Sequence, residues 1–363
     1  MRNLINDTPA KRNYTFIDNI RCIAMMGIVA DHAFNVGDYI FKTHSASFWA
    51  YGINIQLAKF GTITFFLLAG FLLGDKFAEY TPAQYLKRRF KNTFRPWIIW
   101  SLIFLIAIMA KSAVMALRIY HDPFDVWASL LSTLKIVYLY SNYWFIINFL
   151  ICIGILLMFK RRLYSWKLGV ALLACTLFYS INVYFEWIEP IHTTALFGFV
   201  FFLWLGAQMH KNWEMVERKI RTMPLLVFTG MFLMTLALTM AETHVLLQRH
   251  SIEPYNTLRV TNLLYSLAVF ALLVKIRDFN LLSYFKPRET TFGIYLIHYI
   301  IIYNILPEIL IHLDVVNAAD MSLAGICTYQ YSRFIITYVV TFFIVKGINT
   351  TRFKWVIGNT VKS

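Results

Sequence analysis

Ionisable side chains occur within a hydrophobic stretch that is long enough to cross a bilayer, FIDNIRCIAMMGIVADHAFN over residues 16–35. If this stretch is a helix, Arg21 and His32 are about three turns apart and share one face, about 16 Å from each other. Ionisable groups at membrane depth are costly, so they face a bundle interior or a wet cavity and mark function. Histidine is suited to general base catalysis, and His32 is therefore the leading candidate to take a proton from an attacking hydroxyl.

Two carboxylates accompany these residues in the same stretch. Asp18 lies one turn before Arg21, which predicts a salt bridge between the two. Asp31 precedes His32 directly and points about 100° away around the helix, so it is not an obvious partner for that imidazole. An alternative interpretation places Asp18 and Arg21 at the headgroup level and His32 in a hydrogen bond near the other interface.

A dense run of basic residues precedes the third hydrophobic stretch, in the sequence YLKRRFKNTFRPWIIW. Guanidinium groups bind phosphate oxygens in bidentate fashion, so Arg88, Arg89 and Arg95 are candidates to hold an anionic ligand. The alternative is a basic cluster that anchors the chain at the cytoplasmic membrane surface.

The composition indicates a polytopic membrane protein. Of the 363 residues, 59% are hydrophobic and 17% aromatic, with a mean hydropathy of +0.58, which is too apolar for a soluble domain. The net charge of +15 comes from Lys and Arg gathered between alternate hydrophobic stretches. That distribution is typical of cytoplasmic loops, so the expected partner is the lipid bilayer and not nucleic acid.

The hydrophobic stretches predict an all-α fold, a polytopic bundle of about ten transmembrane helices with both termini in the cytoplasm. The expected spans are 16–35, 54–74, 96–111, 142–159, 167–185, 194–210, 223–241, 258–274, 290–313 and 331–348. Residues 112–142 are expected to form an outer loop with an interfacial or re-entrant helix. The chain is thereby divided into a cytoplasmic segment (1–15), a transmembrane domain (16–349) and a basic cytoplasmic tail (350–363).

The sequence predicts no metal site and no permanently bound cofactor. The four cysteines stand singly and without metal-ligand spacing, at positions Cys22, Cys152, Cys175 and Cys327. There is no P-loop, GxSxG elbow, HExxH or glycine-rich dinucleotide turn. The chemistry is therefore expected from histidine, arginine and tyrosine side chains among the helices.

Several stretches, occurring in this order along nearly the full chain, resemble the landmarks of the acyltransferase-3 family of integral-membrane acyltransferases. They are IDNIRCIAMMGIVADHAF, FFLLAGFLLG, the basic run before Pro96, NYWF and FGIYLIH. The family's two arginines spaced RxxR depart from that pattern here, because Lys91 follows Arg88 and Asn92 follows Arg89 at that spacing. Arg95 is the candidate to compensate.

The resemblance implies transfer of an acyl group, commonly acetyl from acetyl-CoA, to a hydroxyl of a cell-envelope polysaccharide or lipid-linked glycan at a bacterial inner membrane. It implies that His32 is catalytic and that Arg21 supports donor binding or catalysis, with acyl-CoA as a substrate. Direct transfer and an acyl-histidine intermediate both stay open, as do the acceptor and the oligomeric state. The alternative function is a transporter or exporter of a glycan or lipid-linked glycan that uses the same polar cavity without chemistry.

Three residues are further candidates for acceptor contact or structural support. His298 and Tyr295 belong to FGIYLIH. In one interpretation His298 orients a partner or lines the acceptor path, and in the other it is a structural histidine. Trp144 belongs to NYWF. The aromatic residues of that motif are interpreted as an interfacial belt, with stacking of an aromatic ring on a sugar as the alternative.

Overall fold

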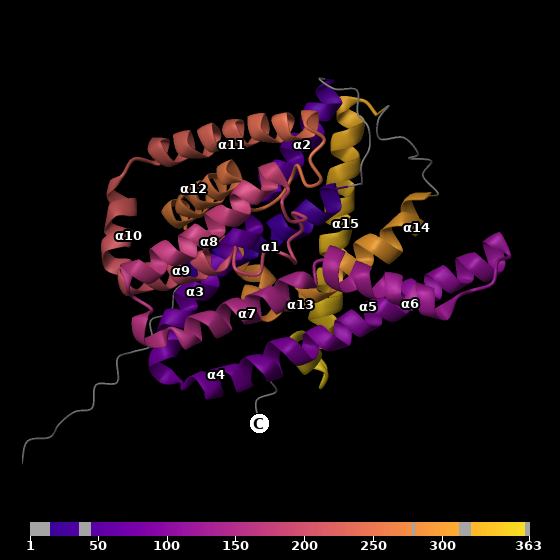
Figure 1. The fold of residues 1–363 in the computed structure, drawn as a ribbon, viewed down its shortest axis with the longest axis horizontal. Helices are drawn as coiled ribbons and strands as arrows, with labels where there is room; N and C mark the ends of the chain where they lie inside the picture. The colour runs from indigo at the N-terminus through magenta and orange to yellow at the C-terminus, as the bar shows by residue number, and fades with distance from the viewer. Residues whose placement is uncertain (1–14, 36–44, 278–279, 312–320, 360–363) are drawn as a thin grey trace, which may run out of the picture.

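The computed structural model describes residues 15–35, 45–277, 280–311 and 321–359 of the chain. Within these ranges the regular structure is entirely helical and contains no strand, which confirms the predicted fold class (Figure 1). The predicted cytoplasmic segment 1–15 lies outside the described residues except for its last position.

Most helices follow the preceding one within a few residues, and longer segments connect α8 to α9 (186–199) and α11 to α12 (249–259). The first half of the chain forms α1 (Thr15–Phe34), α2 (Ala46–Ala58), α3 (Gly61–Glu79), α4 (Pro82–Arg89), η1 (Phe90–Phe94), α5 (Arg95–Val114), η2 (Met115–Tyr120), α6 (Val126–Lys135), η3 (Ile136–Tyr140), α7 (Trp144–Met158), η4 (Lys160–Arg162) and α8 (Trp166–Phe185). The second half forms α9 (Val200–Lys211), α10 (Trp213–Thr222), α11 (Leu225–Gln248), α12 (Val260–Ile276), η5 (Asn280–Phe285), α13 (Pro287–Ile300), η6 (Ile301–Ile305), α14 (Leu306–Ile311), α15 (Leu323–Asn349) and η8 (Lys354–Ile357).

Six helical stretches of the described residues are long and apolar enough to cross a membrane, or seven if the pair 126–140 and 144–158, bent by 54°, is one broken span. α1 is not among them, because its 20 residues include Asp18, Arg21 and Asp31. α9, with 12 residues, and α12, with 17 residues, are shorter than the approximately 20 residues that a bilayer core requires. The number of about ten spans therefore stays a prediction.

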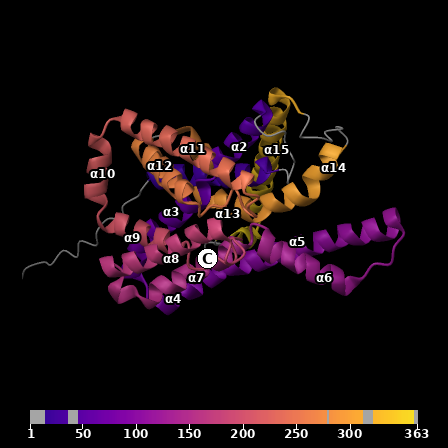
Figure 2. The ribbon, with the colours of Figure 1, turned by 45° about the horizontal axis from the view of Figure 1, so that its top comes forward.

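The region expected to be an outer loop is mostly helical. One helical stretch continues from Pro82 to Tyr120, and a second covers residues 126–140. Figures 1 and 2 both show α5 and α6 as a hairpin that extends to one side of the bundle. The helix over 126–140 fits the interfacial or re-entrant helix that was expected within 112–142. The expected loop is wrong over 112–120, because the helical stretch of α5 continues through Lys111 to Tyr120.

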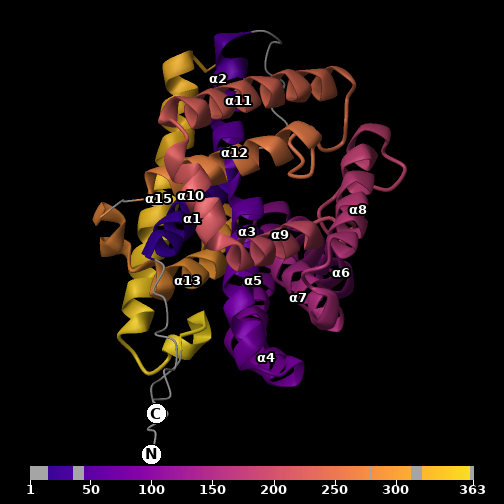
Figure 3. The same cartoon turned by 90° about the vertical axis from the view of Figure 1, so that its left-hand side faces the viewer.

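α1 lies inside the bundle, where it contacts α2, α3, α13 and α15 (Figure 3). Apolar side chains cover most of its circumference, and Ile17, Ile20, Ala24 and Val29 are almost completely buried. A helix that is apolar nearly all round is expected at the centre of a helical protein. The polar residues of α1 must then face cavities between the helices.

Helices α3 and α9 pack with their backbones in close approach. A Cβ atom on Gly70 would collide with the backbone carbonyl of Leu203, and one on Gly206 with that of Leu67. Only glycine leaves room for this approach. The pairing fixes α3 beside α1 and thereby places the residues of α3 that line the cavity described next.

Candidate active site

One face of α1 contributes residues to two neighbouring cavities. Arg21 lines the first cavity, His32 lines the second, and Ile28 lines both. Ile28 lies seven residues after Arg21 and four before His32, which puts all three on one side of the helix. Phe145 and Tyr295 also line both cavities, so the two share a wall.

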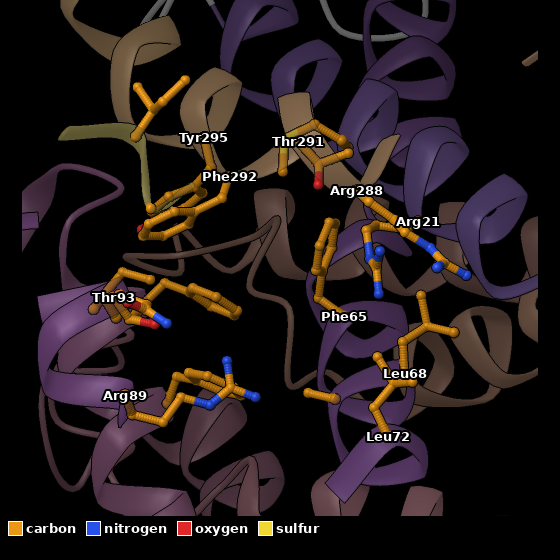
Figure 4. Close-up of a pocket in the computed structure, with 18 of the residues that line it drawn as sticks. Arg21, Phe65, Leu68, Leu72, Arg89, Thr93, Arg288, Thr291, Phe292 and Tyr295 are labelled. Atoms are coloured by element: carbon orange, nitrogen blue, oxygen red, sulfur yellow. The ribbon is translucent and has the colours of Figure 1, made fainter. Parts of the chain in front are cut away.

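The first cavity, here called the arginine cavity, has a volume of about 380 Å³. Figure 4 shows Arg21 and Arg288 close together on one wall and Arg89 extending from the opposite wall. The remaining wall is largely apolar, with amide and hydroxyl groups from Asn92, Thr93, Thr291 and Asn359, and includes Met25, Phe65, Leu68, Leu72, Phe149 and Phe292. Positive charge in a half-apolar cavity suits an anionic ligand that has an extended neutral arm.

A single carboxylate connects two of these arginines. Arg21 Nη1 donates to Asp18 Oδ1 at 2.9 Å, and Arg288 Nε donates to Asp18 Oδ2 at 2.6 Å. The structure thus contains the predicted pair of Asp18 with Arg21 and adds Arg288 to it. Arg288 was not among the sequence candidates, because it lies 270 residues from Asp18 and no local pattern connects them.

The arginines of the basic run have different environments. Arg89 lines the arginine cavity, and its Nε donates to the Tyr85 hydroxyl at 2.7 Å. Arg88 is exposed and binds the Tyr80 hydroxyl instead. Arg95 is also exposed, with its guanidinium 5.8 Å from the Trp355 ring. Of the three predicted arginines, the structure brings only Arg89 into the cavity.

The position three residues after Arg89 holds an amide. Asn92 lines the arginine cavity together with Arg89, because the π-helical turn η1 continues α4 into α5. The second guanidinium expected from the RxxR pattern is therefore absent at that position. Arg288, which reaches the same cavity from α13, supplies a positive charge that Arg95 does not.

The second cavity, here called the histidine cavity, has a volume of about 170 Å³ and a mainly polar lining. It is lined by His32 and His192, by the charged residues Asp31, Lys59 and Glu253, by the amide or hydroxyl groups of Asn35, Thr62, Ser141, Asn142 and Thr257, and by the aromatic residues Tyr140, Trp144 and Tyr299. Such a set of donors, acceptors and aromatic faces suits a ligand rich in hydroxyl groups.

His32 is in contact with two aromatic rings of α13. Its imidazole centroid lies 5.4 Å from that of His298 and 5.2 Å from that of Tyr299, whose ring is perpendicular to it. His298 is fully buried, and its Nδ1 lies 3.0 Å from the Ile294 carbonyl oxygen. That contact requires the proton on Nδ1, so Nε2 is left as an acceptor. His298 Nε2 has no hydrogen-bond partner among the described residues.

Two of the sequence landmarks hold each other in place. Asn142 Nδ2 donates to the Tyr295 carbonyl oxygen at 2.9 Å, the Tyr295 hydroxyl donates to the Asn142 carbonyl oxygen, and the Tyr143 hydroxyl donates to the Leu296 carbonyl oxygen at 2.6 Å. This reciprocal pairing fixes α13 against the start of α7. His298 is thereby held at a constant position beside α1.

The interfacial belt expected for the NYWF aromatics is wrong. Tyr143 is fully buried, and Phe145 lies between the two cavities. Trp144 lines the histidine cavity and stacks on His192, with ring centroids 4.8 Å apart. The Tyr143 hydroxyl bonds to the Leu296 carbonyl oxygen, while Trp144 and Phe145 pack against other rings of the bundle, and an apolar pattern alone does not reveal these contacts.

The structure adds two cavity residues that the sequence analysis did not select. Lys59 forms an ion pair with Asp31 at 2.9 Å, in the short break between α2 and α3. His192 comes from the segment between α8 and α9, and burial, together with the charge of Lys59, lowers its pKa to about 3. The sequence did contain a signal for Lys59, because a lysine within an apolar span is costly and usually marks a functional site.

A buried hydrogen-bond network supports the wall around His192. Arg259, which is fully buried, donates to Gln56 Oε1 at 2.6 Å, and Gln56 Nε2 donates to Asn262 Oδ1 at 2.8 Å. Asn262 Nδ2 donates to the Thr257 carbonyl oxygen at 2.7 Å, and Thr257 Oγ1 lies 3.0 Å from His192 Nε2. A satisfied polar network of this kind specifies one arrangement of the surrounding side chains.

The apolar helices define a multi-pass membrane protein, and two adjoining cavities lie within its helical bundle. The model of the acyltransferase-3 family, described as an acyltransferase domain, matches residues 14–345. The chain therefore belongs to this family and is a membrane acyltransferase, which confirms the resemblance found in the sequence. No curated protein and no solved structure shows a significant match to the chain.

Proposed function

We propose that this membrane acyltransferase moves an acyl group, in the simplest case acetyl, from acyl-CoA to a hydroxyl of a cell-envelope polysaccharide or lipid-linked sugar. The observation that carries the proposal is the shared wall of the two cavities, formed by Ile28, Phe145 and Tyr295. A thioester that reaches this wall from the arginine cavity meets an acceptor hydroxyl in the histidine cavity.

The arginine cavity is assigned to the donor. Its volume of about 380 Å³ is near the lower end for ligand pockets, which suits the acyl-pantetheine arm better than the complete nucleotide. Arg89 and Arg288 offer guanidinium groups to phosphate oxygens, and the apolar wall suits the methylene groups of the arm. The bulk of the nucleotide then lies at the mouth of the cavity, on the side of Arg89.

The histidine cavity is assigned to the acceptor. Its amide, hydroxyl and charged groups match the hydroxyl groups of a sugar, and the Trp144 indole provides an apolar face for a sugar ring. Asp31 is paired with Lys59, and His32 lies one helical turn from Ile28 of the shared wall. The acceptor hydroxyl is therefore presented to His32.

The reaction follows from these positions. His32 takes the proton from the acceptor hydroxyl, and the hydroxyl oxygen attacks the carbonyl carbon of the thioester. The carbon–sulfur bond then breaks, and the CoA thiolate leaves with the proton that His32 returns. The products are the acyl ester of the acceptor and CoA with a free thiol. His298 Nε2, an acceptor with no hydrogen-bond partner among the described residues, lies beside His32 and can accept a hydrogen bond from its imidazole during the reaction, which would orient the ring.

The distance along α1 suits transfer across the membrane. Arg21 and His32 are separated by three helical turns, or about 16 Å, roughly half the apolar thickness of a bilayer. With α1 starting on the cytoplasmic side of a bacterial inner membrane, cytosolic acyl-CoA enters the arginine cavity. The acceptor approaches His32 from the opposite half of the membrane.

Mass spectrometry of envelope glycans tests this function. Isogenic strains carry the wild-type protein, His32→Asn, His121→Asn or no copy, at matched expression. His121 is exposed at the end of η2, where its positive φ also tolerates asparagine, so it is a control for the same substitution. An ester-linked acetyl group in the wild-type and His121→Asn strains only is the expected result. Unchanged acylation with altered glycan export indicates the transporter instead.

A further inference from the structure

The described residues that follow α15 fold back onto the helical bundle. Residues 350–359, here called the C-terminal strap, follow α15 and include η8. The Trp100 indole of α5 donates to the Val356 carbonyl oxygen at 3.0 Å, and Ile357 is almost completely buried. The strap is therefore bound to the fold, although it lies beyond residue 345, where the family match ends.

An amide side chain fastens the end of the strap. Asn359 Nδ2 donates to the Glu289 carbonyl oxygen at 2.7 Å and to Asn349 Oδ1 at 2.6 Å. Asn349 Nδ2 donates to the same Glu289 carbonyl oxygen at 3.1 Å. Three segments, α13, α15 and the strap, are thus joined at one point.

The strap forms part of the arginine cavity. Ile357, Gly358 and Asn359 line it, and Gly358 lies beside Asn92 and Phe292. These two bonds use both Nδ2 hydrogens of Asn359. Its Oδ1, an acceptor, is therefore the part of the side chain that can bind a ligand. Among the described residues, no donor is recorded for that oxygen.

Gly358 permits the strap to close this wall. Its φ of 81° lies in the left-handed region, where glycine is favoured. A Cβ atom at this position would lie 2.6 Å from Phe292 Cδ1 and 2.7 Å from the Asn92 carbonyl oxygen. Any side chain here would move two other residues of the cavity wall.

We propose that the C-terminal strap is part of the acyl-donor site and contacts the pantetheine arm. The inference rests on the proposed function. The arm contains two amide groups, and the strap side of the cavity presents Asn359 and Asn92 to hydrogen-bond with them. Residues outside the part of the chain that defines the family thereby set donor affinity.

Calorimetric titration of the purified full-length protein with CoA and with ADP, which lacks the arm, tests the proposal. The variants are Gly358→Ala and Asn359→Ala. Gly347→Ala is the control, because a Cβ atom there meets nothing within 4 Å. Gly358→Ala and Asn359→Ala are expected to raise the Kd for CoA about fivefold to tenfold, the effect of about one hydrogen bond. The control and the Kd for ADP are expected to stay as in the wild type.

Three results would overturn the proposal. An unchanged Kd for CoA in both strap variants refutes the strap inference alone, provided that the wild type binds CoA and transfers the acyl group. Equal weakening of CoA and ADP binding assigns the strap a general structural role. A wild-type protein that binds no CoA refutes the proposed function together with the inference.

Discussion

The imidazole rings of His32 and His298 lie side by side, with centroids 5.4 Å apart, although 266 positions separate the residues in the sequence. His298 keeps its Nδ1 against the Ile294 carbonyl oxygen, and no described residue donates to its Nε2. In the proposed reaction, this acceptor receives a hydrogen bond from the His32 imidazole and so orients the catalytic ring. His298 is therefore a positioning residue in the proposed reaction.

Replacement of His298 tests that role. His298→Asn is expected to lower the rate of acyl transfer about 100-fold, because His32 loses the acceptor that orients it, while the KM for the acyl donor stays unchanged. Steady-state kinetics of the purified protein measures both quantities. A donor KM that rises in parallel, or a rate equal to that of His121→Asn, would contradict the assignment.

Two adjacent arginines provide a matched test of the donor site. Arg89 lines the arginine cavity and Arg88 is exposed, so Arg89→Gln is expected to raise the Kd for CoA about 10-fold to 100-fold, the value of a hydrogen bond between charged groups. Arg88→Gln is expected to change it less than threefold. Calorimetric titration distinguishes the two. Equal effects would assign the basic run to general attraction of anions at the membrane surface.

A larger side chain in the shared wall tests whether the cavities act together. Ile28 lines both cavities, and Ile28→Trp fills the boundary between them with a larger side chain while every arginine of the arginine cavity is kept. Acyl transfer is expected to fall at least about 100-fold while CoA binding is retained, because reacting groups must approach within van der Waals distance. Retained binding also shows that the variant folds. Transfer at the wild-type rate would mean that the acyl group takes another route.

Alanine substitutions at a crowded glycine and at an uncrowded glycine test the packing of α3 on α9. Gly70→Ala forces a methyl group against the Leu203 carbonyl and is expected to destabilise the protein by about 1–3 kcal/mol. Gly230→Ala, where a Cβ meets nothing within 4 Å, is expected to be neutral or to stabilise α11 by about 0.5–1 kcal/mol. Thermal unfolding in detergent compares them. A lower unfolding temperature for Gly230→Ala than for Gly70→Ala would refute this packing.

The sequence predicted those parts of the site that depend on one helix or one motif. Arg21 and His32 belong to a single apolar stretch, so helical periodicity alone puts them on one face. Arg89 was selected together with Arg88 and Arg95, because charge alone does not tell an exposed guanidinium from one in a cavity. The bundle determines that difference through the direction of α4 and η1.

The remaining parts depend on contacts between distant segments. Arg288 meets Asp18, and Lys59 meets Asp31, only after the helices pack. The length of α9 was not predicted either. Its 12 residues are fewer than those of the expected span 194–210, because the chain before Val200 forms turns and not a helix. The inward rotation of Tyr143 also requires its bond to the Leu296 carbonyl, which no local pattern encodes.

The most direct test of the account measures CoA binding and acyl transfer in one preparation of the purified His32→Asn protein, with His121→Asn as the control. We expect His32→Asn to bind CoA with the wild-type Kd and to lose at least about 100-fold in transfer rate, because the donor cavity is intact and the general base is missing. Transfer by His32→Asn at a rate close to that of His121→Asn would contradict the assignment of His32 as the catalytic residue.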